Sequence, residues 1–412
     1  MAERTAPASM LGGTSDRREF LAGVAALTAG ALAAANEAQA QTPAPGRPRF
    51  IDFHHHFQSP EWVKYANANG VRVPQFEREP VFNSLWTPER GIEAMDKAGV
   101  DIAYQSHATY YTKQGLMQVA GKNPRESKTV IKYARESNEY GARITADSKG
   151  RFRFLPVLPL PDIDASLKEI EYAYASLKPV GVCLPGSVGG RDYIGNVKWT
   201  PIHEELNRRK AIVHVHPAEP DWSIDLEPGV EAASVWYGVD TAVAIATLLN
   251  NNIATKYPNI RWVFSHAGGG FPAMAGRIIN LRGDAGAAEG GGRAAAGGGG
   301  RDGGGGRAAG ARGGGDAAAA GGGRAGGRGR AAGDPNQGLR EARSFYYDCA
   351  ASTNRYTMQA VKNLVTNSQL VFGSDYPWSN ITSLTTALPD CGFTPAELNA
   401  LNYGNGERMA ST

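Results

Sequence analysis

Short apolar runs alternate with longer segments of mixed polarity along most of the chain. The runs are rich in Val, Ile, Phe and Tyr, which is typical of strands that are buried on both faces of a parallel sheet. We count eight such runs, at residues 49–56, 100–107, 152–160, 180–185, 211–216, 261–266, 345–350 and 369–375.

Helical patterns lie between these runs. Residues 88–98 begin with a proline directly after Thr87, a plausible N-cap, and residues 162–177 and 241–256 carry apolar side chains at helical spacing. Eight repeats of strand and helix predict a closed (β/α)8 TIM barrel, of class α/β, rather than an open sheet. The predicted barrel domain spans residues 49–412.

The first 40 residues have the pattern of an export signal rather than of a folded domain. A twin arginine, Arg17-Arg18, precedes an Ala-rich apolar stretch at 21–35, and Ala38-Gln39-Ala40 fits a cleavage site. This resembles a twin-arginine signal peptide, which implies a bacterial protein that is exported in the folded state to the periplasm or beyond. A membrane anchor is the alternative, but the stretch is short against the roughly 20 apolar residues of a membrane span.

A Pro-rich linker at 41–48 follows the signal, and a second unusual segment interrupts the barrel at 283–333. That segment is almost wholly Gly, Ala and Arg, so it cannot bury a core, and we expect it to be disordered. Arg-Gly-rich segments can bind nucleic acid. We favour the simpler interpretation, an insertion tolerated in a surface loop between the sixth and seventh strands.

Composition narrows the class of protein further. The net charge is only +3, so we expect neither a nucleic-acid partner nor, after signal cleavage, a membrane surface. The three cysteines are far apart and form no CxxC pair, which argues against a disulfide scaffold and a cysteine zinc site.

Residues of metal-ligand type recur where the predicted strands end. His54 and His56 close the first run, His216 the fifth, His266 the sixth and Asp375 the eighth. The carboxyl ends of parallel barrel strands open on one face, so these side chains are expected to meet. His54 and His56, two residues apart, point to the same side of their strand and can chelate one ion.

The remaining histidines fit structural roles better. His55 points to the other side of its strand and is expected to pack between barrel and helix. We also favour core positions for His107 and His203. His214 shares a side with His216, so it either lines the pocket or hydrogen-bonds to groups behind the site.

Several motifs together give a specific resemblance. They are Asp52-x-His54-x-His56, His216-Pro217, His266-Ala-Gly-Gly-Gly-Phe-Pro272 and Gly373-Ser-Asp375-Tyr-Pro377, with Leu85-Trp86-Thr87-Pro88 and Tyr347-Asp348 in support. In order and spacing they resemble the amidohydrolase-2 family, which includes aminocarboxymuconate-semialdehyde decarboxylase. The resemblance covers about residues 50–409, apart from the Gly/Ala/Arg segment. Finer features, around 199–207 and 257–266, are similar to methylsalicylate-type decarboxylases.

The resemblance implies the composition of the site. His54, His56, His216 and Asp375 would hold one divalent metal ion, and His266 would be a catalytic acid/base beside it. Asp375 would also take part in proton transfer. The nitrogen-rich set favours zinc, and manganese tolerates the same ligands. The family further implies a small-molecule substrate and a homodimer.

The substrate-binding residues follow less directly. Some decarboxylases of this family place an arginine before the Leu-Trp segment to hold the substrate carboxylate, but Glu79 falls at that position here, with Arg78 next to it. Either the register slips and Arg78 serves, or another group such as Arg191 or a neighbouring subunit's arginine does. A pocket lined by Trp378, Trp236, Tyr110 and Tyr111 would suit an aromatic substrate, and ordinary packing of four aromatic side chains in loops is the alternative.

Two chemistries fit such a site. We favour nonoxidative decarboxylation of an aromatic or enol-like carboxylic acid. The alternative is hydrolysis of a lactone, ester or amide. A non-catalytic exported binding protein is a third possibility, and the presence of every metal-site residue argues against it.

The export signal leads to a direct prediction. If it is removed at the Ala38-Gln39-Ala40 motif, the mature protein begins at Gln41. Mass spectrometry of the protein recovered from the periplasm of its host should find the first 40 residues gone. Periplasmic protein that still carries Met1 would contradict the prediction.

Overall fold

The computed structural model describes residues 48–68, 86–107, 127–218, 220, 223, 233–279 and 336–411. The predicted signal peptide, most of the linker and the Gly/Ala/Arg segment lie outside these residues. Within the described part, none of the helices combines the length and apolar character needed to cross a membrane.

Eight parallel strands form the centre of the molecule. They are β1 (Phe50–Phe57), β2 (Val100–His107), β3 (Phe152–Phe154), β4 (Gly181–Pro185), β7 (Ile212–His216), β8 (Arg261–Phe264), β9 (Tyr346–Asp348) and β10 (Leu370–Val371). They pair in the orders β1-β2-β3 and β10-β9-β8-β7-β4, so each strand lies beside the next one in the chain. All eight predicted runs therefore contribute a strand, and the TIM barrel is confirmed.

Two seams close these sheets into a barrel. At the first, Cys183 N donates to Pro156 O (2.9 Å) and joins β4 to the segment after β3. At the second, Phe53 N donates to Phe372 O (2.9 Å) and Asp375 N donates to His54 O (2.7 Å), which joins the first strand to the last.

A buried carboxylate reinforces the seam between β1 and β10. Asp52 Oδ1 accepts from the backbone N–H groups of His54 (3.0 Å) and Ser374 (2.9 Å), and its Oδ2 accepts the Ser374 hydroxyl. Because Asp52 is fully buried, these bonds form without competition from water. The seam fixes the backbone of Asp375 against that of His54.

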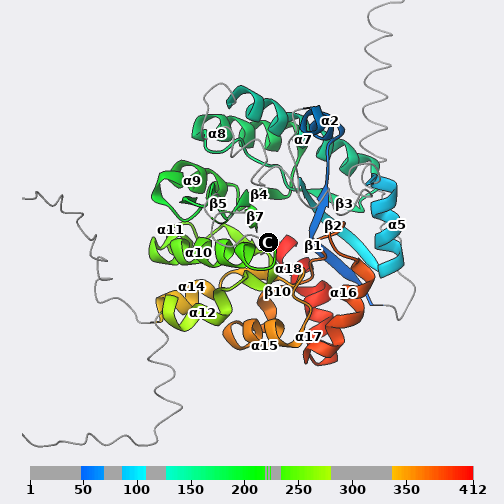
Figure 1. The fold of residues 1–412 in the computed structure, drawn as a ribbon, viewed down its shortest axis with the longest axis vertical. Helices are drawn as coiled ribbons and strands as arrows, with labels where there is room; N and C mark the ends of the chain where they lie inside the picture. The colour runs from blue at the N-terminus through cyan, green and yellow to red at the C-terminus, as the bar shows by residue number, and fades with distance from the viewer. Residues whose placement is uncertain are drawn as a thin grey trace, which may run out of the picture.

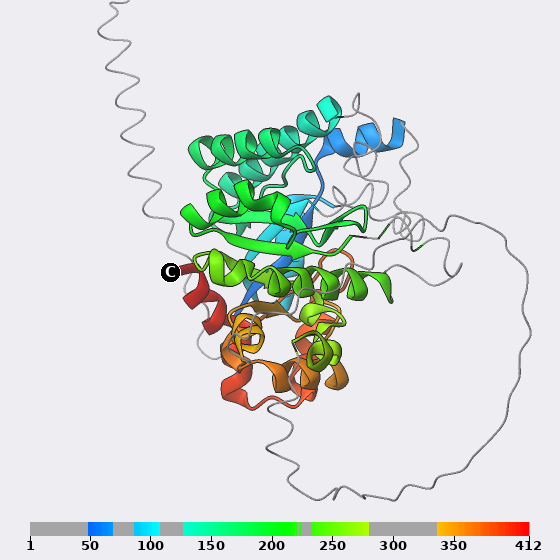
Figure 2. The ribbon, with the colours of Figure 1, turned by 90° about the vertical axis from the view of Figure 1, so that its left-hand side faces the viewer.

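Helices surround the strands on all sides (Figures 1 and 2). The longer ones are α2 (Pro60–Ala68), α5 (Pro88–Ala98), α7 (Ser127–Asp147), α8 (Ile163–Tyr172), α9 (Thr200–Arg208), α10 (Trp236–Asn250), α12 (Phe271–Ile278) and α15 (Arg355–Leu364). Shorter ones are α11 (Ile253–Lys256), α14 (Gln337–Ala342), α16 (Ile381–Ala387), α17 (Pro395–Asn399), α18 (Asn405–Ser411), η1 (Ala173–Leu177), η2 (Val197–Trp199), η3 (His266–Gly268), η4 (Asn367–Gln369), η5 (Leu388–Cys391) and η6 (Ala400–Gly404). The predicted helix at 88–98 has the expected limits, and Thr87 caps it by accepting from Arg90 N.

The strand and helix limits differ from the sequence prediction in places. The third run was expected to reach residue 160, but β3 ends at Phe154. Pro156 and Pro159 lack the N–H groups that a ladder needs, so regular pairing stops there. A short antiparallel hairpin, β5 (Ser187–Val188) with β6 (Asp192–Tyr193), follows β4 and was not predicted. The predicted helix at 241–256 begins earlier, at Trp236, and is split into α10 and α11.

The C-terminal helix packs at the amino-terminal end of the barrel. Arg261, the first residue of β8, donates to Met409 O of α18 (2.6 Å), and Asn405 donates to Leu370 O at the start of β10 (2.8 Å). In Figure 2 α18 lies at one end of the barrel. The opposite end, where the strands finish, is left for the site.

Two glycines in different surroundings give a test of this packing. A Cβ on Gly181 in β4 would lie 2.1 Å from the Ile212 carbonyl oxygen, whereas one on Gly276 in α12 would meet nothing within 4 Å. Gly181→Ala should therefore lower the free energy of unfolding by about 1–3 kcal/mol or more, since the strand pair must separate. Gly276→Ala should raise it by about 0.5–1 kcal/mol. Chemical denaturation measures both, and equal effects would contradict this packing of β4 on β7.

Candidate metal centre

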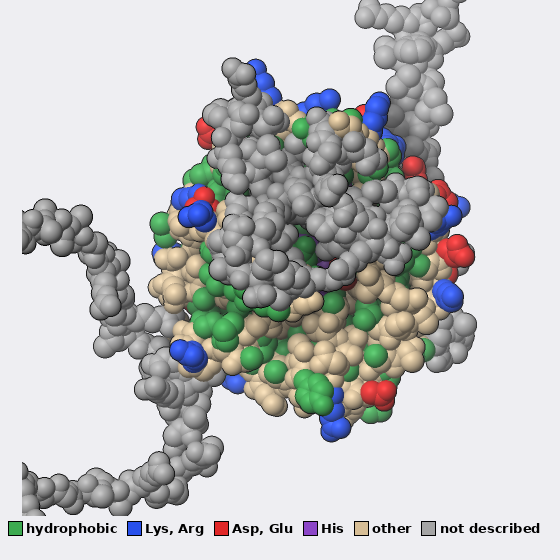
Figure 3. Space-filling model, in the orientation of Figure 1, with side chains coloured by type: hydrophobic (Ala, Val, Ile, Leu, Met, Phe, Trp, Pro, Cys, Tyr) green, Lys and Arg blue, Asp and Glu red, His purple; other side chains and the backbone are tan. Residues whose placement is uncertain are grey.

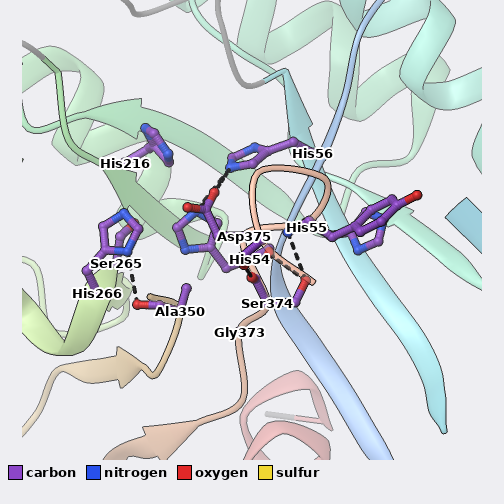
Figure 4. Close-up of polar contacts among 12 residues, drawn as sticks. His54, His55, His56, His216, Ser265, His266, Ala350, Gly373, Ser374 and Asp375 are labelled. Atoms are coloured by element: carbon purple, nitrogen blue, oxygen red, sulfur yellow. Dashed lines mark hydrogen bonds and ion pairs between the residues drawn. The ribbon is translucent and has the colours of Figure 1, made fainter. Parts of the chain in front are cut away.

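Two side chains of β1 and one from the segment after β10 meet at the carboxyl end of the barrel. His56 Nε2 lies 3.0 Å from Asp375 Oδ1, His54 Nε2 lies 3.3 Å from the same oxygen, and the two Nε2 atoms are 3.0 Å apart (Figure 4). His216, the last residue of β7, joins them, with its ring centroid 5.2 Å from that of His54 and 4.9 Å from that of His56.

The four side chains fit a divalent metal ion. One ligand atom from each of His54, His56, His216 and Asp375 lies within 4.8 Å of every other. Tetrahedral zinc with bonds of about 2.0–2.1 Å to nitrogen places its ligands about 3.3 Å apart, close to the three separations given above.

Hydrogen bonds behind the rings turn the Nε2 atoms of these histidines toward the centre. His54 Nδ1–H donates to Asp348 Oδ2 (3.0 Å), and His216 Nδ1–H donates to Pro217 O (2.9 Å). His56 Nδ1 pairs with the Ser106 hydroxyl (3.1 Å). Such partners fix the tautomer and orientation of metal-binding imidazoles. The Asp348 carboxylate and Pro217 O can only accept, so His54 and His216 keep a proton on Nδ1 and present Nε2 to an ion.

In the metal-free site, the charged groups favour one proton, on His54. Burial opposes a charge on His54, but the carboxylates of Asp348 and Asp375 outweigh it and raise its pKa to about 10. Burial lowers the pKa of His56 to about 4 and outweighs the hydrogen bond to the Asp375 carboxylate, which raises it. His216 is likewise neutral, because burial and the neighbouring histidines lower its pKa well below the usual value. A cation would replace the proton on His54.

His266 lies beside these four residues rather than among them. Its ring centroid is 4.9 Å from that of His54 and 6.1 Å from that of His216. Its Nδ1–H donates to Ala350 O (3.0 Å), so Nε2 is free to exchange a proton. His266 has a left-handed backbone, with φ of 55°, and Asp375 has φ of 57°. Conformations that non-glycine residues rarely adopt are common at functional sites.

The other histidines occupy structural positions. His55 Nδ1 pairs with Asp52 (3.0 Å), and its ring points away from the metal group toward α5, where a Cβ on Gly91 would lie 3.8 Å from Nε2 (Figure 4). His107 packs against Phe57 and Trp62. His203 Nε2–H donates to Ile194 O (2.9 Å) in the helix layer. The core positions expected for all three agree with these contacts.

The structure adds one residue that the sequence analysis gave no role. Asp348 ends β9, is 1% exposed, and accepts from the rings of His54 and His214. His214 thus hydrogen-bonds behind the site and does not line the cavity, which decides between the two roles left open for it. The available signal was the position of Asp348, an acidic residue near the end of an apolar run.

A cavity of about 730 Å³ opens onto the metal group. Its described lining consists of His216, Ala233, Ser234, Val235, Tyr237, Gly238, Val239, His266, Gly269, Gly270, Ala351, Ser352, Thr357, Asp375, Trp378 and Ser379. In Figure 3 a small area of histidine surface is visible in a hollow on this face of the molecule. Rings and small side chains around a few polar groups are typical of a small-molecule site.

The predicted substrate-binding residues lie in different parts of the molecule. Trp378 lines the cavity, as the sequence analysis expected of an aromatic wall. Arg191 is exposed in the turn between β5 and β6 and is not part of the lining. Arg78, Tyr110 and Tyr111 lie outside the described residues. Among the lining residues that the structure describes, none is a lysine or an arginine.

The fold and the assembled site define the class of protein. The chain belongs to the amidohydrolase family, whose model matches residues 51–409. Several relatives are named as decarboxylases, so the chain is an enzyme, a decarboxylase or a hydrolase.

Particular relatives can be named. The chain is 27% identical over 350 residues to Decarboxylase yanB of Aspergillus niger, covering 81% of this chain and 78% of that one. It is 27% identical to the 6-methylsalicylic acid decarboxylase of Penicillium expansum over 79% of this chain and 84% of that one. The fold matches 5-carboxyvanillate decarboxylase of Novosphingobium aromaticivorans, solved with manganese and 4-hydroxy-3-methoxy-5-nitrobenzoic acid, with a TM-score of 0.68, 17% identity, and 91% and 99% coverage.

The proton on His54 leads to a prediction about metal uptake. At pH 6 the metal-free protein carries this proton, since the pKa of His54 is about 10, while His56, with a pKa of about 4, carries none. Metal binding at pH 6 should therefore release about one proton, and the affinity should rise with pH by up to about tenfold per unit. Calorimetric titration of Zn²⁺ or Mn²⁺ in buffers of different ionisation enthalpy counts the protons. Uptake without proton release would contradict the assignment of the charge to His54.

Proposed function

We propose that this enzyme is a metal-dependent nonoxidative decarboxylase of an aromatic carboxylic acid. The observation that carries the proposal is a cavity with His216, His266 and Asp375 together at one end and aromatic and aliphatic side chains around it. The relatives named as decarboxylases, at 27% identity over most of the chain, support the same reaction class.

We propose that His54, His56, His216 and Asp375 hold the ion. Their three imidazoles favour zinc, and manganese, which the Novosphingobium enzyme binds, is compatible with the same set. A bound divalent ion would supply positive charge that attracts the anionic oxygens of the substrate and stabilises negative charge on its ring. Since no lysine or arginine lines the described part of the cavity, this charge would be the principal anchor for the carboxylate there.

His266 would supply the proton that replaces carbon dioxide. Its Nδ1–H donates to Ala350 O, so Nε2 is the nitrogen through which it would exchange a proton with the substrate. Transfer of this proton to the ring carbon that bears the carboxylate interrupts the aromatic system. The carbon–carbon bond then breaks, its electrons restore the ring, and carbon dioxide leaves. Asp375, which is only 15% exposed beside His54 and His56, balances the positive charge of the histidines.

The aromatic ring of the substrate has two candidate contacts. Trp378 and Tyr237 both line the cavity, and the backbone N–H of Trp378 donates to Asp375 O (2.8 Å), which keeps this wall next to the metal group. Stacking or edge contacts with such rings hold an aromatic acid better than an aliphatic one.

We further propose roles for the segments of the chain that lie outside the described residues. Residues 1–40 direct export to the periplasm by the twin-arginine route, and 283–333 form an insertion of the barrel without a binding role. The sequence pattern also gives a linker at 41–48 and a barrel domain at 49–412. A homodimer is proposed from the family alone, and gel filtration with light scattering tests it.

Decarboxylation is tested by gas release from the metal-loaded enzyme. We expect carbon dioxide from 2-hydroxybenzoate-type acids, including 6-methylsalicylate, and one equivalent of zinc or manganese by elemental analysis. His266→Asn should lower kcat about 10²–10⁴-fold with unchanged metal content, because the proton donor is lost while the ligands remain.

A matched control is His203→Gln. His203 is also buried, and its N–H bond to Ile194 O can be replaced by an amide, so kcat should stay close to that of the unchanged enzyme. Turnover of lactones or esters with no gas from any of the acids would overturn the decarboxylase proposal in favour of hydrolysis.

A further inference from the structure

One buried carboxylate hydrogen-bonds both to His54 of the metal group and to the backbone of His266. Asp348 Oδ2 accepts from His54 Nδ1–H (3.0 Å) and His214 Nε2–H (3.2 Å). Asp348 Oδ1 accepts from the backbone N–H groups of His266 (3.0 Å) and Ala350 (3.0 Å). Its side chain is fully buried, so each oxygen has two protein donors and no competition from solvent.

Asp348 Oδ2 determines which nitrogen of His54 can bind an ion. A carboxylate oxygen can only accept, so Asp348 keeps a proton on His54 Nδ1, and Nε2 is the nitrogen whose lone pair can bind an ion once the ion replaces its proton. That Nε2 lies 3.3 Å from Asp375 and 3.0 Å from His56 Nε2. His214 occupies the other side of the same oxygen and limits its rotation.

Asp348 Oδ1 determines where His266 lies. It holds the backbone N–H of His266, a residue in a left-handed turn that needs support from its surroundings. It also holds the N–H of Ala350, and the carbonyl of Ala350 accepts from His266 Nδ1–H (3.0 Å). Asp348 therefore supports His266 through both its backbone and its ring.

The close packing at this point leaves Asp348 little room to move. A Cβ on Gly373 would lie 2.8 Å from the Cβ atoms of both Asp348 and His54, so the backbone of the last strand passes directly beside the pair. The pair is therefore held by backbone as well as by hydrogen bonds.

We propose that Asp348 is the positioning residue that couples metal binding to proton transfer. One of its oxygens sets the tautomer of the ligand His54, and the other sets the place of the acid/base His266. The inference rests on the proposed metal-dependent function, and it assigns Asp348 no contact with the substrate.

Asp348→Asn separates the two roles. The amide has nearly the volume of the carboxylate, and its one oxygen is required by the N–H groups of His266 and Ala350. Its NH₂ group must then face the imidazoles and donate to His54 Nδ1, which moves the ring proton to Nε2, the atom meant for the ion. The dissociation constant for Zn²⁺ or Mn²⁺ should rise about 10–100-fold.

Asp348→Ala removes both roles. It should weaken metal binding as Asp348→Asn does, and in addition it frees the N–H groups that fix His266. At saturating metal, kcat should therefore be lower for Asp348→Ala than for Asp348→Asn, with KM for the acid changed little in either. If the alanine variant does not fold, the metal affinity of the asparagine variant still decides the first role.

Glu169→Gln is the control for loss of a buried carboxylate. Glu169 is 2% exposed and binds Asn138 and Arg135 on the helical layer, away from the site. Its metal affinity should equal that of the unchanged enzyme. Metal binding by Asp348→Asn as tight as that of the control would overturn the positioning role. If the unchanged enzyme itself binds neither metal, the proposed function fails instead, so the two failures are distinguishable.

Discussion

The seam between the first and last strands is the constraint on which the site depends. Asp52, buried at this seam, binds the backbone and hydroxyl of Ser374 with one carboxylate, and the backbones of His54 and Asp375 are hydrogen-bonded directly. Without this closure, β1 and the segment after β10 would be separate ends of an open sheet. The two histidines and the aspartate would then have no reason to meet.

The sequence predicted the barrel well because its signal is repeated. Eight apolar runs separated by helical segments leave few alternative architectures, and the ends of the runs gave His54, His56, His216 and Asp375. Alternation along one strand correctly turned His55 away from them. These features depend on local periodicity and on the known geometry of parallel strands, which a single sequence contains.

The parts that were missed depend on three-dimensional contacts. Nothing local distinguishes Asp348 from any acidic residue at a strand end, since its importance comes from His54 and His214, 294 and 134 positions away. β3 is short because Pro156 and Pro159 interrupt regular pairing, and the apolar pattern of the run does not show this interruption. Arg191 was named only as another group that could hold the carboxylate, and it lies exposed on a hairpin that was not predicted, outside the described cavity lining.

The pairing of the first strand with the last also has a consequence for biosynthesis. His56 is made early, and Asp375 follows 319 residues later in the chain. A nascent chain on the ribosome therefore has an incomplete set of four ligands for almost the whole of its synthesis. Contacts this far apart in sequence form slowly, because a long loop must close first. Coordination by all four side chains would require Asp375 to have been made and the barrel to have closed, so a complete metal site would form only after closure.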